Sequence, residues 1–256
     1  MATRHAPLAA FVLHHHDWSE SSLILDLFTR EQGRLVVAAR GAKKPHSNFR
    51  AVLLPFQRLS VALGRGDAHA EVQTLRSAEF AGGPGLPRGE ALFAGFYCNE
   101  LLMKLLARHD PHPRLFDAYA ATLPRLAGPD EAVQAALRAF ELVLLRDIGL
   151  LPDLAHETST QRPARPGAHY TLRGDAGLVE STDRGTPDGA TWLALQSALD
   201  ADASRADPAA LAPLQAACAR ELPALRTQLR ALLHYHLGTS ALRSRQLLVD
   251  LQSLAA

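Results

Sequence analysis

The residues best suited to chemistry form a cluster of positive side chains near the start of the chain. Residues 30–50 contain six Lys and Arg against one carboxylate, Glu31, although the formal net charge of the whole chain is only +1. A local excess of one sign attracts polyanions even when the total charge is close to zero. The candidate phosphate-binding residues in this segment are Arg34, Arg40, Lys43, Lys44 and Arg50.

Charge alone allows two interpretations of this cluster. Lys and Arg can neutralise phosphates along a nucleic-acid backbone without reading its bases, and nearby aromatic rings can stack on unpaired bases. Phe49 and Phe56 are the local aromatic candidates, although Phe56 follows Pro55 in an apolar run and suits a core better. The alternative is a solvated loop that binds no polyanion.

The elements that must position the cluster have the pattern of a small β-barrel. Short runs rich in Val, Leu and Phe, bounded by turn residues, predict strands. The expected strands are residues 8–16, 21–29, 34–40, 56–63 and 70–76. Five such strands suit a closed barrel of the OB or SH3 kind, with most of the basic segment on the connection between the third and fourth strands.

A helical region follows the Gly/Pro-rich linker at 81–89. Apolar residues recur with helical spacing over 90–109, 113–127 and 130–149, and again from 191 onward. Between them, residues 151–190 contain four prolines and an alternating stretch, HYTLRGDAGLVES, that predicts one hairpin. The predicted fold class is α+β. We expect an OB-fold barrel over 1–80, a helical domain over 81–150 and 191–256, and an insertion over 151–190.

Enzyme motifs are missing from the sequence. It contains no G-x-S-x-G elbow, no G-x-x-x-x-G-K phosphate loop and no Rossmann glycine pattern. Cys98 and Cys218 fall among apolar helical residues and suit packing. We therefore expect no catalytic residue and no cofactor. No apolar run reaches the roughly 20 residues of a membrane span and no signal peptide is evident, so we expect a cytoplasmic protein with no membrane partner.

Several stretches of the chain resemble a known family. They include VLHHHDWSESSLILDLFTREQGRL, ARGAKK, GRGDAHAEVQTLRSAE, LRAFELVLLRDIG and LGTSALRSRQLL. In this order they look like the bacterial RecO family of DNA repair and recombination mediators. The resemblance implies an OB fold, a helical body and a zinc-finger-like insertion. It also implies binding to ssDNA and dsDNA, annealing of complementary strands at the nucleoid, and contacts with RecR and the C-terminal tail of single-strand-binding protein (SSB). We expect the isolated protein to be a monomer.

The insertion departs from the family pattern. Many members carry four cysteines there, whereas residues 151–190 contain none. His156 and His169 alone do not supply the tetrahedral set of nitrogen and sulfur ligands that structural zinc requires. We therefore predict a metal-free insertion held by its hairpin and by packing.

Two further sites are predicted outside the basic segment. Arg243 and Arg245 are candidates for a second DNA contact, and the alternative is a C-terminal helix with solvent-facing arginines. Arg138 borders an apolar helix face, and the resemblance implies that it binds the carboxylate of the SSB tail. The alternative is a salt bridge from Arg138 to Glu141 or Asp130. The resulting hypothesis is a non-enzymatic recombination mediator. Its rival is an OB-plus-helix scaffold whose basic loop binds RNA or a protein.

Overall fold

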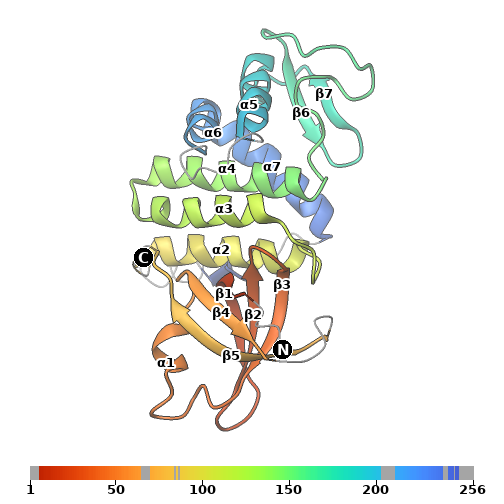
Figure 1. Ribbon diagram of the computed structural model, residues 1–256. Helices are drawn as coiled ribbons and strands as arrows, with labels where there is room; N and C mark the ends of the chain where they lie inside the picture. The colour runs from red at the N-terminus through yellow and green to blue at the C-terminus, as the bar shows by residue number, and fades with distance from the viewer. Residues whose placement is uncertain are drawn as a thin grey trace. The chain divides into compact units, whose positions relative to one another are not determined.

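Alternating apolar residues close the N-terminal part of the chain into a five-stranded barrel (Figure 1). The computed structural model describes residues 6–64, 70–83, 85, 87–202, 211–238, 242–244 and 246–247. The strands pair in the order β1-β2-β3-β5-β4, and β4 closes the barrel on β1. In the barrel β3 and β5 pair in parallel, and the other four strand pairs that the structure describes are antiparallel. The predicted OB-type barrel is confirmed. Its strands are β1 (Leu8–Asp17), β2 (Leu23–Thr29), β3 (Gly33–Ala39), β4 (Leu59–Leu63) and β5 (Gln73–Phe80).

Branched apolar side chains fill the barrel interior. Leu25 and Leu27 of β2, Leu35 and Val37 of β3, and Val61 of β4 are all fully buried in one core cluster. They occupy alternate positions because successive side chains of a strand point to opposite faces of the sheet. The connections between strands are left at the rim, where charged residues can gather.

Helix α2 (Glu90–Leu105) packs beside β1, and its polar residues have structural partners. Asn99 Nδ2 donates a hydrogen bond to Leu13 O at 2.9 Å. The Glu100 carboxylate accepts hydrogen bonds from Arg243 N at 3.0 Å, Ser244 N at 2.9 Å and Ser244 Oγ at 2.7 Å. These contacts hold residues 243–244 against the helix. No helix in the described part of the chain is long and apolar enough to cross a membrane.

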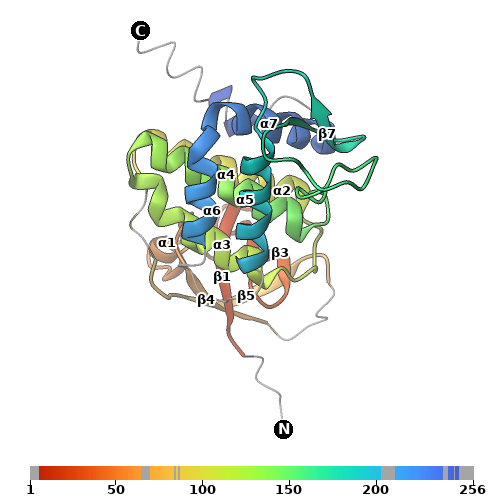
Figure 2. The same cartoon turned by 90° about the horizontal axis from the view of Figure 1, so that it is seen from above.

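The chain divides into two compact units, Met1–Phe116 with Arg243–Ala256, and Asp117–Leu242. In the second unit, α6 packs against α4 and α5 (Figures 1 and 2). The domain limits expected from the sequence, at residues 80, 150 and 190, stay a prediction. The remaining helical elements are α1 (Phe49–Val52), α3 (Pro113–Thr122), η1 (Leu123–Ala127), α4 (Asp130–Asp147), α5 (Gly189–Asp202), α6 (Leu211–Cys218), η3 (Ala219–Glu221) and α7 (Leu222–Leu237).

The predicted hairpin is present as β6 (His169–Arg173) and β7 (Gly177–Ser181). Side-chain hydrogen bonds connect it to the neighbouring helices. Gln228 Oε1 of α7 accepts from Thr171 Oγ1 at 3.0 Å and from Leu172 N at 2.7 Å. The buried Trp192 of α5 donates from Nε1 to Tyr170 O at 3.3 Å. These contacts fasten the cysteine-free hairpin to α5 and α7.

Candidate nucleic-acid interface

The basic loop, residues 40–50, leaves the barrel where β3 ends at Ala39. Ala42 is buried in the barrel core, and Phe49 packs against that core from the far end of the loop. These two anchors turn the apolar side of the loop inward. Three of the four charged side chains between and beside them face solvent. Arg40, Lys44 and Arg50 are exposed and form no ion pair with the described residues. We call these three residues the loop cations.

Lys43 occupies a different position within the same loop. Its Nζ lies 3.2 Å from Asp17 Oδ2 at the end of β1, and the lysine side chain is partly covered. Its backbone N–H donates to Ser21 O at 2.9 Å. An exposed pair of this kind contributes at most about 1 kcal/mol, so a phosphate can compete with Asp17 for the ammonium group.

Arg34 points into the protein. Its Nε donates to Asp26 Oδ1 at 3.1 Å, and the two side chains are only 15% and 12% exposed. Its Nη1 donates to Leu106 O at 3.2 Å and to Met103 O, two carbonyls at the C-terminal end of α2. Helix C-termini carry carbonyl groups without partners in the helix, and a cation there is favourable. This geometry favours a structural role for Arg34 over a phosphate contact.

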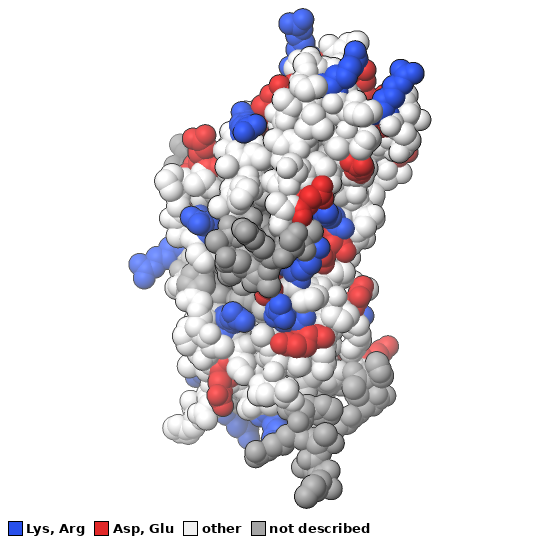
Figure 3. Space-filling model, turned by 45° about the horizontal axis from the view of Figure 1, so that its top comes forward, with Lys and Arg blue, Asp and Glu red and all other residues white. Residues whose placement is uncertain are grey.

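The carboxylate of Glu31 lies apart from the loop cations. It accepts a hydrogen bond from Ala9 N at 3.1 Å beside the β2–β3 turn. The local positive excess at the loop cations is therefore not offset by this residue. On the face of the molecule in Figure 3, by contrast, positive and negative side chains of the described residues are interspersed.

Arg243 is exposed on the segment that Glu100 holds. Its charge also affects the pKa of His14 in β1. Burial lowers the pKa of His14, and the neighbouring His16 and His15 and the charge of Arg243 lower it further, against the opposing effect of Asp26. Arg243 thus belongs to the same compact unit as the barrel and lies near a histidine of β1. Arg245 lies outside the described residues.

Arg138 is buried inside the second unit, with 6% of its surface exposed. Its Nη2 donates to the carboxylate of Glu141, which is fully buried. This is the salt bridge that the sequence offered as the alternative to tail binding. Leu137 and Phe140 beside it are buried as well, so the apolar face of α4 belongs to the core. Binding of the SSB tail at Arg138 stays a prediction.

The two aromatic candidates near the basic loop, Phe49 and Phe56, both pack against apolar neighbours. Phe56 is fully buried beneath α2, against Phe96, as its apolar surroundings indicated. Phe49 packs on the barrel core. The exposed ring is Trp18, in the turn between β1 and β2, which sequence reasoning passed over. Its signal is a tryptophan between polar residues in HDWSES, where no apolar partner is available nearby in the chain.

The two histidines of the insertion have oxygen partners within the protein. His156 Nδ1 lies 2.9 Å from Asp153 Oδ2, and His169 donates from Nδ1 to Thr186 O at 2.7 Å. Within the described ranges, no three His, Cys, Asp or Glu side chains are placed to share a metal ion.

Comparisons with known proteins find similar sequences over nearly the whole chain. Residues 5–83 match the family model for the N-terminal part of recombination protein O, and residues 86–246 match that for its C-terminal part. A "DNA repair protein RecO" of Polaromonas sp. (strain JS666 / ATCC BAA-500) is 55% identical over 248 residues, covering 96% of both chains. Another, of Acidovorax ebreus (strain TPSY), is 51% identical over 266 residues and covers 99% of both chains.

Proposed function

The chain belongs to the RecO family of DNA repair proteins, and on this premise we propose that it is a non-enzymatic recombination mediator. It binds single- and double-stranded DNA and anneals complementary strands. The observation that supports this proposal is the outward direction of Arg40, Lys44 and Arg50 at the rim of a small barrel, with no carboxylate partner in the described part of the chain.

Annealing requires two negatively charged backbones to approach each other while their base edges stay free to pair. Long cationic side chains on a loop can contact phosphates without reading sequence. Each contact releases condensed counterions, which drives binding at low salt. Arg243 offers a second cationic position on the same unit as the barrel. The proposed mechanism makes and breaks no covalent bond.

We further propose that the protein acts with RecR on SSB-coated DNA in the cytoplasm, at the nucleoid. Tail binding at Arg138 requires that a carboxylate of the SSB tail take over the interaction that Glu141 makes in the free protein. A tail-peptide titration of Arg138→Ala, folded as judged by circular dichroism, tests this part separately. Unchanged affinity would remove Arg138 from the proposal.

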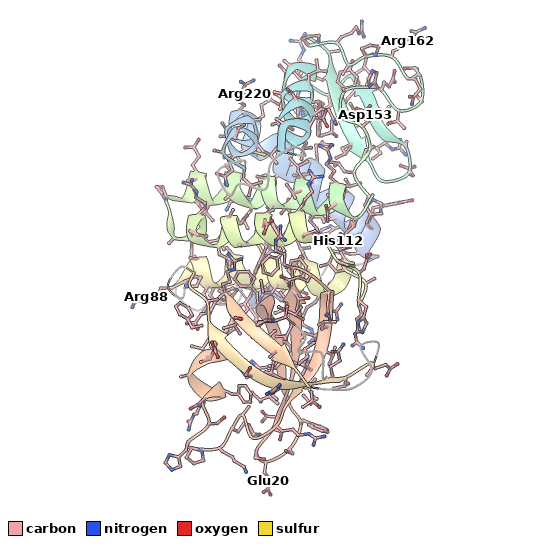
Figure 4. All side chains as sticks on the ribbon, viewed as in Figure 1. Glu20, Arg88, His112, Asp153, Arg162 and Arg220 are labelled. Atoms are coloured by element: carbon pink, nitrogen blue, oxygen red, sulfur yellow. The ribbon has the colours of Figure 1, made fainter. Side chains whose placement is uncertain are left out.

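The decisive experiment is annealing of complementary oligonucleotides coated with SSB. We compare the wild type with R40Q/K44Q/R50Q. The matched control is R220Q/R226Q/R230Q, which removes the same charge from exposed arginines of the second unit (Figure 4 labels Arg220). We expect slow annealing only for the loop variant.

An equal decrease of the annealing rate in both variants would show that only the net charge of the protein matters. It would contradict the assignment of DNA binding to the loop cations. Full activity of the loop variant would refute the role of the loop cations. If the wild type binds neither strand form yet captures RNA or a protein through the loop, the scaffold hypothesis replaces the mediator.

A further inference from the structure

Trp18 is an exposed aromatic side chain beside the basic loop. It keeps 55% of its surface in contact with solvent. Tryptophan has a large apolar surface and is usually mostly buried. An exposed one therefore calls for an explanation. Here the ring lies at the start of the β1–β2 turn, residues 18–22, where it contributes little to the barrel core.

The β1–β2 turn is held in place by hydrogen bonds of its own. Trp18 N donates to Ser22 O at 3.1 Å, and Ser19 N donates to the same oxygen at 3.4 Å. Ser22 itself is buried. The backbone that carries the ring is thus held by the fold, so that binding a ligand has to fix only the two side-chain torsions of Trp18.

The same turn is bonded to the basic loop. Gly41 N donates to Ser22 Oγ at 3.2 Å, and Lys43 N donates to Ser21 O at 2.9 Å. Lys43 Nζ reaches Asp17, the residue before Trp18. These three contacts hold the turn that carries Trp18 against the basic loop. A ring and a row of phosphate-binding groups are therefore presented by one connected piece of structure.

Two carboxylates, Asp17 and Glu20, lie close to Trp18 in the chain, and neither leaves an unpaired negative charge directed at the barrel. Asp17 is paired with Lys43. Glu20 is at the tip of the turn, and Figure 4 shows its side chain pointing away from the barrel.

We propose that Trp18 stacks on an unpaired base of a DNA strand whose phosphates are held by the basic loop. This inference rests on the proposed function and extends it, because it identifies the ligand of this site as single-stranded nucleic acid. A base in the interior of a duplex is already stacked on both faces and offers no face to the indole. Trp18 therefore gives this site a preference for single strands, whereas the loop cations bind both forms.

Tryptophan fluorescence tests the proposal directly. The chain has two tryptophans, and Trp192 is fully buried, so a change of emission on binding reports on Trp18. We titrate the full-length wild type, W18F and W18A with oligothymidylate and with a duplex of equal length, and follow both tryptophan emission and the anisotropy of labelled DNA. The matched control is F80A, which removes an equally exposed ring, 58%, from the end of β5.

We expect oligothymidylate to quench the wild type along the same curve as the anisotropy, and the duplex to quench it far less. W18F keeps a ring and retains binding without the quench. W18A loses about tenfold in affinity for the single strand, the usual effect of removing one stacking ring, and less than twofold for the duplex. F80A behaves as the wild type.

The possible outcomes distinguish a failure of the stacking inference from a failure of the proposed function. If the wild type binds DNA but shows no quench and W18A binds as tightly, the stacking inference is overturned and the proposed function stands. If W18A loses single-strand and duplex affinity equally, Trp18 is not a stacking residue. If the wild type binds neither DNA form, the proposed function itself fails. Quenching of Trp18 by a protein partner in place of DNA would make the ring an interface anchor and would also overturn the inference.

Discussion

Replacing Arg34 by methionine tests whether this arginine stabilises the fold or binds DNA. Methionine is similar in length to the aliphatic part of the arginine side chain but lacks the guanidinium group. It leaves the Asp26 carboxylate, only 12% exposed, without its partner at 3.1 Å, and leaves the carbonyls of Met103 and Leu106 without a donor. Hydrogen bonds to charged groups contribute about 1.5–3 kcal/mol, and orphaning a buried charge costs about 3–5 kcal/mol. For this partly covered pair we expect a loss of about 3 kcal/mol in the free energy of unfolding.

The DNA-binding behaviour of the same variant should be normal. Each phosphate contact contributes about 0.7 to the slope of log affinity against log salt for a single strand. K44Q removes one exposed cation and should lower the slope by about that amount, while its stability stays within about 0.5 kcal/mol of the wild type. R34M should leave the slope unchanged. Urea unfolding measures the first quantity, and anisotropy of labelled oligonucleotide over a salt series measures the second.

A double-mutant cycle with D26N completes the test. Contacting charged residues show coupling energies of about 0.5–3 kcal/mol, so we expect R34M/D26N to lose less than the sum of its single variants. A slope reduced by R34M as much as by K44Q, without loss of stability, would refute the structural assignment and return Arg34 to the DNA surface.

Three further outcomes follow from buried polar groups. R138A should cost about 3–5 kcal/mol of unfolding free energy, because it removes the guanidinium group that donates to the buried Glu141 carboxylate, and R138M/E141L should recover most of that loss in urea unfolding. Q228A should cost about 2 kcal/mol and speed amide exchange at Leu172, whose N–H loses its acceptor; protection equal to the wild type would contradict this. Burial opposes ionisation of Glu100, but hydrogen bonds from Ser244 and Arg243 outweigh it and lower its pKa below the ordinary 4.5. The difference in unfolding free energy between the wild type and E100Q should therefore be largest at neutral pH and decrease as the pH falls below 4.5. A pH-independent difference in urea unfolding would count against the role of the carboxylate.

The elements of this fold were predictable because their signals are local. Strand alternation and turn residues placed the five strands within a few residues of their observed limits, and helical spacing did the same for α2 and α4. The hairpin of the insertion was predictable from one alternating stretch. The family could be recognised because its similar stretches occur in order along the chain.

The direction of individual side chains was not predictable in this way. Arg34 and Arg40 lie six residues apart at the two ends of β3, yet one is bound to Asp26 and the other faces solvent. That difference depends on the pairing of β2 with β3, which brings Asp26 opposite Val36, two residues from Arg34. Arg138 is a similar case, since its burial depends on the packing of α4.

The sequence by itself determined the type and order of the elements, the barrel-plus-helices class, and the segment in which positive charge gathers. Only the tertiary structure decided which of those charges are available to a ligand, and it brought Trp18 beside them. The physical reason is range: backbone preferences and apolar periodicity act over a few neighbouring residues, whereas the solvation of a charge or a ring depends on residues that only folding brings into contact.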